Sequence, residues 1–222
     1  TDWAYGTGID WVGRLVEEVT GQRLGEYFEE HIFAPLQMNS TGFKITEGMR
    51  ARLAPVHVRD EAGHLVATDF EIEQDPKHEM GGGGLYSTPD DYLKFCRALL
   101  GGGALGQQRI LAQSTVELMS ENHMGTLLMR DLPTSAPELT NDLSFFPESQ
   151  KNWGLSFMRN EQPTEHGRPA GTLSWAGLAN SYFWIDLKGK TAGIWATQLF
   201  PFNDDVARQN FYEFESAVQR SI

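Results

Sequence analysis

The chain has 222 residues, enough for a large core in one domain or two. Hydrophobic residues make up 40% of it and aromatic residues 11%, which excludes an intrinsically disordered protein. The net charge of −12 disfavours nucleic acid as a partner, and no apolar run approaches the roughly 18 residues expected of a membrane span.

The first half of the chain is dominated by helical periodicity. Apolar residues from Ile9 to Val19 recur at helical spacing and predict a helix that stops at Gly21. A second helical stretch starts near Leu24, and we expect it to end at Pro35, because proline has no N–H to continue a helix.

The middle of the chain alternates between short extended segments and helices. Residues 53–58 and 65–70 suggest a hairpin, and four consecutive glycines at 81–84 suggest close backbone packing. Thr88 followed by proline and two aspartates predicts the start of another helix. Residues 125–152 are mixed in character and are expected to form a long loop.

The last part of the chain predicts an antiparallel sheet and a terminal helix. Strands are expected at 153–158, 171–175, 181–186 and 191–199, with a helix near 204–219 packed on one face of the sheet. The fold class is therefore α+β.

Several segments, taken in order, resemble one superfamily, the class C β-lactamases and family VIII carboxylesterases. The resemblance spans most of the chain and implies a β-lactamase/transpeptidase-like fold. It divides the chain into a mainly helical region, 1–152, and a region of sheet and C-terminal helix, 153–222. The segments that carry it are Tyr-Gly-Thr-Gly-Ile-Asp at 5–10, Pro-Leu-Gln-Met at 35–38, Thr-Gly-Phe at 41–43, Gly-Gly-Leu-Tyr-Ser-Thr at 83–88 and Trp-Ala-Gly at 175–177.

The superfamily's nucleophile motif is missing. It reads Ser-x-x-Lys, and its spacing lets the lysine take the proton of the serine one helical turn away. No serine of this chain has a lysine three residues on, and Thr41 to Lys44 has the spacing but falls in the Thr-Gly-Phe link. Because the chain also opens at Thr1 rather than methionine, we interpret it as the carboxy-terminal part of a longer protein, with a fold incomplete at the N-terminus.

Tyr5 is the first candidate catalytic residue. The resemblance implies that it shuttles a proton, as general base in acylation and general acid toward the leaving group. The alternative is an ordinary half-buried aromatic residue at a helix entrance. Thr7 stands where β-lactamases usually have asparagine, which weakens the case for a lactam substrate more than for an ester.

Trp175, Gly177 and Leu178 form the second candidate group, for oxyanion and substrate binding. By position in the superfamily, the Leu178 amide would donate one hydrogen bond to the oxyanion, and Gly177 would let the substrate approach the backbone. Trp175 replaces the lysine of the β-lactamases and matches the carboxylesterases. The alternative is a plain core strand with a buried tryptophan. We expect the Tyr5 hydroxyl and the Leu178 amide to lie within roughly 10 Å of each other in one cleft.

No cofactor is expected. The glycine run lacks the Gly-Lys-Ser/Thr of a phosphate-binding loop, and the six histidines show no metal-ligand spacing. Neither a cytoplasmic nor a periplasmic location is favoured. With Cys96 as the one cysteine, no intrachain disulfide can form.

The predicted function of the intact protein is that of a serine hydrolase. It would cleave short-chain esters, and β-lactams weakly, through an acyl-enzyme whose serine lies outside this chain. The alternatives are a penicillin-binding or D-amino-acid peptidase relative and an inactive binding or scaffold protein. The expected partners are a small ester or lactam, and either an N-terminal fragment of the same protein or a second copy of the chain.

Overall fold

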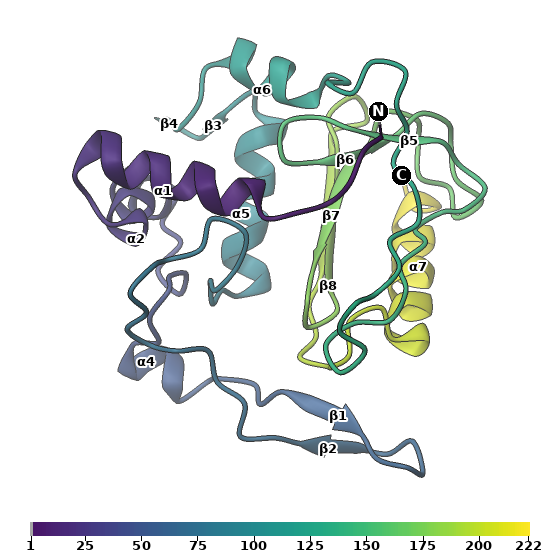
Figure 1. Cartoon of the computed structure of the whole chain (residues 1–222). Helices are drawn as coiled ribbons and strands as arrows, with labels where there is room; N and C mark the ends of the chain where they lie inside the picture. The colour runs from purple at the N-terminus through teal and green to yellow at the C-terminus, as the bar shows by residue number, and fades with distance from the viewer. Residues whose placement is uncertain (1) are drawn as a thin grey trace.

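The computed structural model describes residues 2–222, and its centre is one antiparallel sheet. The strands lie in the order β5-β6-β7-β8-β9, so each is a neighbour of the next along the chain. Helix α5 packs on one face of the sheet, and the C-terminal helix α7 on the other (Figure 1). The bounds of the strands are β5 (Lys151–Trp153), β6 (Met158–Asn160), β7 (Leu173–Gly177), β8 (Ser181–Asp186) and β9 (Thr191–Trp195).

The expected sheet and its covering helix are confirmed, with two corrections. The predicted strand at 153–158 is a hairpin, because the chain turns between Gly154 and Phe157, with Ser156 at φ 74°. The last strand ends at Trp195, and the chain beyond it pairs with the segment at His57 through Gln198 and Phe200.

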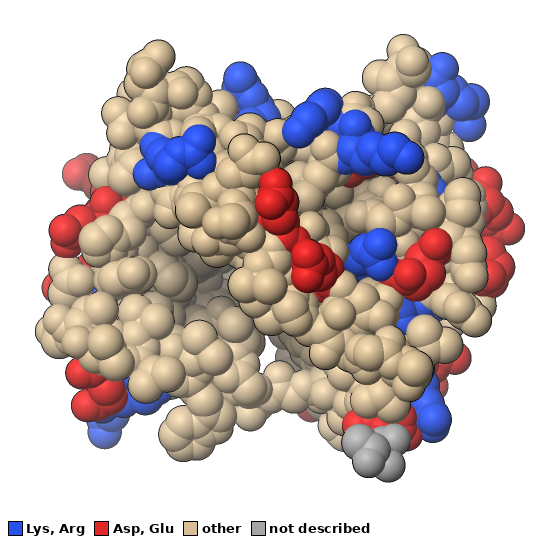
Figure 2. All heavy atoms as spheres, turned by 90° about the horizontal axis from the view of Figure 1, so that it is seen from above, with Lys and Arg blue, Asp and Glu red and all other residues tan. Residues whose placement is uncertain are grey.

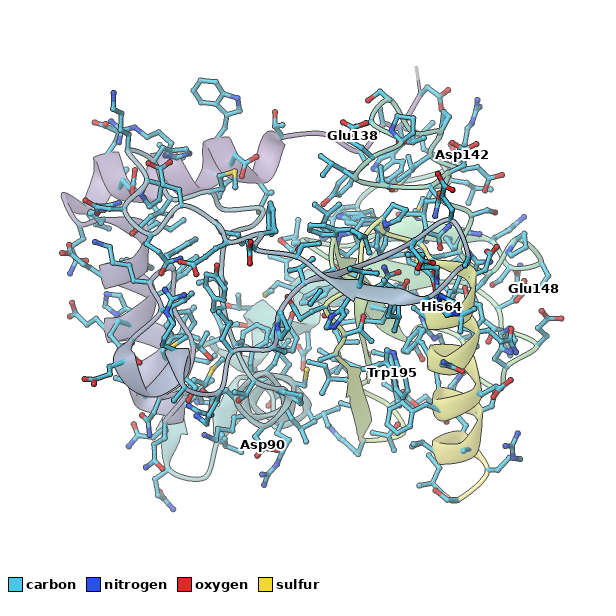
Figure 3. All side chains as sticks on the ribbon, turned by 90° about the horizontal axis from the view of Figure 1, so that it is seen from below. His64, Asp90, Glu138, Asp142, Glu148 and Trp195 are labelled. Carbon is cyan, nitrogen blue, oxygen red and sulfur yellow. The ribbon has the colours of Figure 1, made fainter. Side chains whose placement is uncertain are left out.

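The sheet is covered on both sides because the central strand β8 is apolar at consecutive positions, which point alternately to the two faces. Tyr182 and Trp184 of β8 face α7 (Asp205–Gln219) and contact Phe211. Ile185, on the opposite face, packs against Cys96 and Leu99 of α5 (Pro89–Leu100). At the β9 edge, Trp195 points toward α7 and contacts Phe214 (Figure 3). This alternation fixes the register of the sheet.

A lobe of short helices lies on the α5 side of the sheet, at the left of Figure 1. Helix α1 (Gly8–Thr20) stops at Gly21, which has φ 72°, as predicted. Helical turns from Leu24 run past Pro35 to a stop at Gln37, so the expected end at Pro35 is wrong; a π-helical segment precedes the proline. The successive turns are α2 (Leu24–Phe28), a π-helix (Glu29–Phe33) and α3 (Ala34–Leu36).

The connecting segments complete the fold. The predicted hairpin is confirmed as β1 (His57–Arg59) and β2 (Leu65–Ala67), which project away from the body of the molecule (Figure 1). No helix or strand is assigned between residues 121 and 150, as expected of the long loop. The remaining short elements are α4 (Glu47–Arg50), β3 (Ala104–Leu105), β4 (Gln108–Arg109) and α6 (Gln113–Ser120).

The apolar stripe of α1 is exposed. Trp11 is 74% exposed, Leu15 60% and Val19 77%, while the one buried residue of the helix is Gly13. The helix is instead held at its polar side and at a glycine contact, because Asp10 accepts a hydrogen bond from the Gly82 amide. The periodicity therefore predicted the helix but not a buried face within this chain.

The glycine run forms the contact that holds α1. A Cβ on Gly81 would lie 2.3 Å from the Ile9 carbonyl oxygen, and one on Gly13 would lie 3.1 Å from the Gly81 amide nitrogen. Close packing, expected from the sequence, is confirmed here. Since α1 directly follows residues 2–7, this contact also fixes where that segment begins its path toward the sheet.

We expect Gly81→Ala to destabilise the protein by about 1–3 kcal/mol, because the new methyl group meets backbone atoms that cannot move aside cheaply. Gly83→Ala is the matched control, since the nearest atom to its added Cβ is the flexible end of Met80 at 3.8 Å. Thermal unfolding of the two variants measures the difference. Equal midpoints would show that the α1 contact is looser than described.

A buried ion pair joins the loop before β7 to α7. Arg168 and Glu215 are both at most 1% exposed, and the guanidinium donates two hydrogen bonds of 2.8 Å to the carboxylate. The same guanidinium donates to the Ser174 hydroxyl at 2.7 Å and lies 4.3 Å from the centre of the Phe146 ring. The polar side-chain atoms of the pair therefore all have hydrogen-bond partners within the protein.

Glu215→Gln should lower the free energy of unfolding by about 3–5 kcal/mol, because it leaves the Arg168 charge buried without a counter-ion. Glu213→Gln, an exposed position on the same helix, is expected to change it by less than about 0.5 kcal/mol. Denaturant titration of the two variants makes the comparison. A loss at Glu215 no larger than at Glu213 would contradict the role given to the pair.

Candidate active site

Tyr5 meets Trp175 across 170 residues of sequence. The indole Nε1–H of Trp175 donates a hydrogen bond of 3.2 Å to the Tyr5 hydroxyl oxygen, and the ring centres are 5.0 Å apart. Tyr5 is 48% exposed, so its hydroxyl can be reached by a ligand. A phenol that accepts one hydrogen bond still has its own proton to donate and a second lone pair.

The segment that carries Tyr5 crosses from the sheet to α1. In Figure 1 the purple chain starts beside β5 and runs to the helical lobe, where α1 begins. Near the sheet, Asp2 forms an ion pair of 2.9 Å with Arg130. At the other end, Asp10 and Gly13 hold α1 against the glycine run. Tyr5 therefore lies between these two contacts, one at each end of the segment.

Strand β7 offers an unpaired edge beside Tyr5. It pairs with β8 along its whole length, from Leu173 to Gly177, but with β6 only at Leu173 and Ser174. The Thr172 carbonyl accepts a hydrogen bond from β6. Because the backbone N–H and C=O groups of every second residue in a strand point to the same side, those of Ala176 point to this side as well. The backbone at Ala176 thus faces outward where β6 has ended.

Leu178, the expected oxyanion donor, follows β7 in the turn to β8 and is 46% exposed. Buried Asn180 holds this turn: its amide donates to the Leu199 and Pro201 carbonyls, and its side-chain oxygen accepts from Tyr182. These hydrogen bonds hold the turn in place, as is required of a preorganised backbone donor to an oxyanion. The role of the Leu178 amide and its distance to the Tyr5 hydroxyl stay predictions.

The sequence analysis did not single out two other aromatic residues beside Tyr5 and Trp175. Trp153, at the end of β5, has its ring centre 4.6 Å from that of Trp175 and 6.0 Å from that of Tyr5. Trp3 lies 5.4 Å from Trp153. Their spacing in the sequence shows no periodicity that would group them, although an aromatic residue two positions before Tyr5 was a local signal.

The described residues supply no exposed nucleophile beside Tyr5. Ser174, the serine next to Trp175, is 3% exposed and its hydroxyl is bonded to Arg168. Burial raises the pKa of the Cys96 thiol to about 12, so it stays protonated at neutral pH. Burial lowers the pKa of Lys151, but its ammonium group donates to the Phe146 and Ser149 carbonyls. Ser174 is thus a poor substitute for the missing serine.

Seen from above, the molecule is hollowed between its two lobes, and uncharged residues border most of the hollow (Figure 2). Within residues 2–222, no three His, Cys, Asp or Glu side chains are arranged to hold a metal ion. Over the same residues, no helix has the length and apolar character of a membrane span.

Comparison with curated proteins finds fungal esterases and acyltransferases. The chain is 27% identical to ML-236A carboxylate methylbutanoyltransferase of Penicillium citrinum over 229 residues, 100% of the chain and 54% of that protein. It is 29% identical to the lovastatin esterase of Penicillium rubens, over 99% of the chain and 56% of the relative. The chain therefore spans about half the length of these relatives.

Solved structures share the fold. A mutant of simvastatin synthase from Aspergillus terreus superposes with a TM-score of 0.84 at 28% identity, covering 100% of this chain and 55% of that one. EstCE1, a hydrolase with promiscuous acyltransferase activity, has a TM-score of 0.71 at 22% identity, over 99% of this chain and 56% of its own, which shows the fold alone.

The model of the β-lactamase family matches residues 1–218, nearly the whole chain. The α+β fold and the relatives agree with that match. The chain belongs to the β-lactamase family and corresponds to the carboxy-terminal half of its esterase and acyltransferase relatives.

Proposed function

We propose that this chain supplies the proton-transfer and oxyanion-binding part of a serine-dependent site that cleaves esters through an acyl-enzyme. The observation that carries the proposal is the contact of the Tyr5 hydroxyl with Trp175, beside the free edge of β7. A proton shuttle and an outward-facing strand backbone are two of the three parts that such a site needs.

The third part, the nucleophile, is assigned to a segment outside residues 1–222. The relatives are about twice as long as the stretch matched here, which leaves them room for it. The same segment would cover the exposed stripe of α1 at Trp11, Leu15 and Val19 and pair with the edge strand β9. It reaches the site either as part of the same polypeptide or as a separate fragment.

The proposed reaction has two halves. The serine oxygen attacks the acyl carbonyl, and the Leu178 amide donates a hydrogen bond to the developing oxyanion. Tyr5 takes the proton of the serine hydroxyl during this attack and gives it to the departing alkoxide, which leaves as an alcohol. In the second half Tyr5 takes a proton from water, or from another alcohol, as that molecule attacks the acyl-enzyme. Tyr5 then returns the proton to the serine oxygen as the acid or new ester is released.

Esters suit the site better than β-lactams. A β-lactam antibiotic carries a carboxylate that a nearby cation would hold, and the residue at that place is the neutral Trp175. The curated relatives, named as an esterase and as methylbutanoyltransferases, point the same way and add acyl transfer to the expected activities. Hydrolysis of a lactam would be a weak side reaction.

In the full-length protein, Tyr5→Phe should lower kcat/KM for a chromogenic short-chain ester by about 10²–10⁴-fold, because it removes the group that moves the proton. Tyr27→Phe, on α2, is the matched control and should leave the rate unchanged. Steady-state kinetics of the two variants decides the matter. If Tyr5→Phe keeps the wild-type rate, Tyr5 is not the shuttle.

Residues 1–222 alone should show no turnover of a chromogenic ester or cephalosporin above background, and adding the preceding segment should restore ester cleavage. The measurement is the initial rate with and without that segment. Turnover by residues 1–222 that disappears when one of their own serines is replaced would place the nucleophile here. No turnover by the full-length protein would favour an inactive binding or scaffold protein.

A further inference from the structure

Three tryptophans, Trp3, Trp153 and Trp175, lie in a row of ring contacts beside Tyr5, and we call them the tryptophan wall. Trp153 is in the middle: its ring centre lies 5.4 Å from Trp3 and 4.6 Å from Trp175. The centre of the Tyr5 ring lies 6.0 Å from that of Trp153 and 5.0 Å from that of Trp175. The wall therefore borders one flank of the phenol.

The wall lies at the margin of the core, not within it. All three tryptophans are only partly buried and pack against the outside of the cluster formed by the sheet and α7. A fully internal role would bury them, as it does Trp184, which is 0% exposed. The ring planes are inclined by 37° between Trp3 and Trp153 and by 80° between Trp153 and Trp175, so the partly exposed indoles present an angled apolar surface to a ligand.

The backbone holds the central member of the wall firmly. Trp153 ends β5, where it pairs with Met158 of β6, and Met158 pairs in turn with Ser174 of β7. Ser174 is bonded to the buried Arg168. Trp153 and Met158 thus lie in one row with Ser174, and Trp175 is the next residue on β7, so both indoles are carried by strands of the sheet and not by a loop.

The position of the wall indicates which part of an ester it meets. This step rests on the proposed function, in which Tyr5 passes its proton to the leaving alcohol. The alcohol oxygen must then lie at about 3 Å from the Tyr5 hydroxyl. The carbon skeleton attached to that oxygen begins beside Tyr5, where the Trp153 ring contacts Tyr5 and the Trp3 ring lies behind Trp153. The acyl group is bonded to the nucleophile and lies beyond the carbonyl carbon.

We propose that the tryptophan wall is the subsite for the alcohol part of the substrate, and that Trp153 selects alcohols with flat or ring-shaped hydrocarbon skeletons. In acyl transfer the same subsite holds the acceptor alcohol, since the acceptor oxygen gives its proton to Tyr5 from the same place. Trp153 is a specificity-determining residue with no part in the bond-breaking step.

The test uses the full-length protein and three esters. 2-Naphthylmethyl acetate carries the ring on the alcohol side, ethyl 2-naphthylacetate carries it on the acyl side, and ethyl acetate has no ring. Trp153→Leu should lower kcat/KM for 2-naphthylmethyl acetate by at least about tenfold, mainly through KM, because a large apolar contact is lost. The kcat/KM values for the two ethyl esters should change by less than about threefold, because neither ester carries a ring on its alcohol part.

Tyr27→Leu is the matched control, since it replaces an aromatic residue by leucine on α2, outside both the wall and the exposed stripe of α1. It should leave all three values unchanged. If Trp153→Leu instead lowers the value for ethyl 2-naphthylacetate, the wall meets the acyl group and the proposal is wrong. Equal losses for all three esters would also overturn it, because they would mark a structural effect.

A binding measurement keeps this inference separate from the proposed function. 2-Naphthalenemethanol, the free alcohol, should bind the wild-type protein and Tyr27→Leu equally, and Trp153→Leu at least about tenfold more weakly by titration calorimetry. Equal affinity for the wild type and Trp153→Leu, or no binding by the wild type because another segment covers the wall, would overturn the subsite. Failure of Tyr5→Phe to slow the reaction would overturn only the proton-transfer role.

Discussion

The arrangement of the site depends on the unequal pairing of β7. One side of this strand is paired with β8 over five residues, while the other side is paired with β6 over only two. The free stretch, Trp175 to Gly177, lies beside Tyr5. A strand whose backbone is free on one side can bind a carbonyl group as another strand would, and a strand paired on both sides cannot.

A strand with a free edge needs support from elsewhere, and β7 has it from α7. The guanidinium of Arg168 is held by Glu215 and donates to the Ser174 hydroxyl, one residue before the free stretch begins. At the other end, Asn180 ties the turn after β7 to the Leu199 and Pro201 carbonyls. Both anchors are buried polar groups with partners, which favour a single geometry over a loosely packed one.

The sequence predicted the parts of the fold whose signals are local. Periodicity found α1, α5, α7 and the strand β8, and Gly21 marked the end of α1 as expected. The same reasoning failed where a distant contact decided the outcome. Positive φ at Ser156 turns the predicted strand into a hairpin, and pairing with His57 ends β9 early. Pro35 did not stop its helix because a π-helical segment precedes it.

For the site, resemblance to a family identified residues that local patterns could not. Tyr5 and Trp175 are in contact in the fold, but nothing in their spacing relates them. Trp3 and Trp153 were missed because neither lies in a family motif. The buried pair of Arg168 and Glu215 was equally hidden, since each residue, taken alone, reads as an ordinary surface charge.

Trp175 also sets the electrostatic character of the site. A lysine at this place would bring a full positive charge beside the phenol and a ready partner for a substrate carboxylate. The indole provides one hydrogen-bond donor, which it directs at Tyr5, and otherwise an apolar face. A carboxylate entering here would lose its hydration without gaining a counter-ion, and that cost is several kcal/mol for a buried charge. A neutral ester has no such cost, and its hydrocarbon groups gain from the contact. Under the proposed function, the indole in place of an ammonium group therefore gives a substrate carboxylate no counter-ion at this position, while it offers a neutral ester an apolar contact.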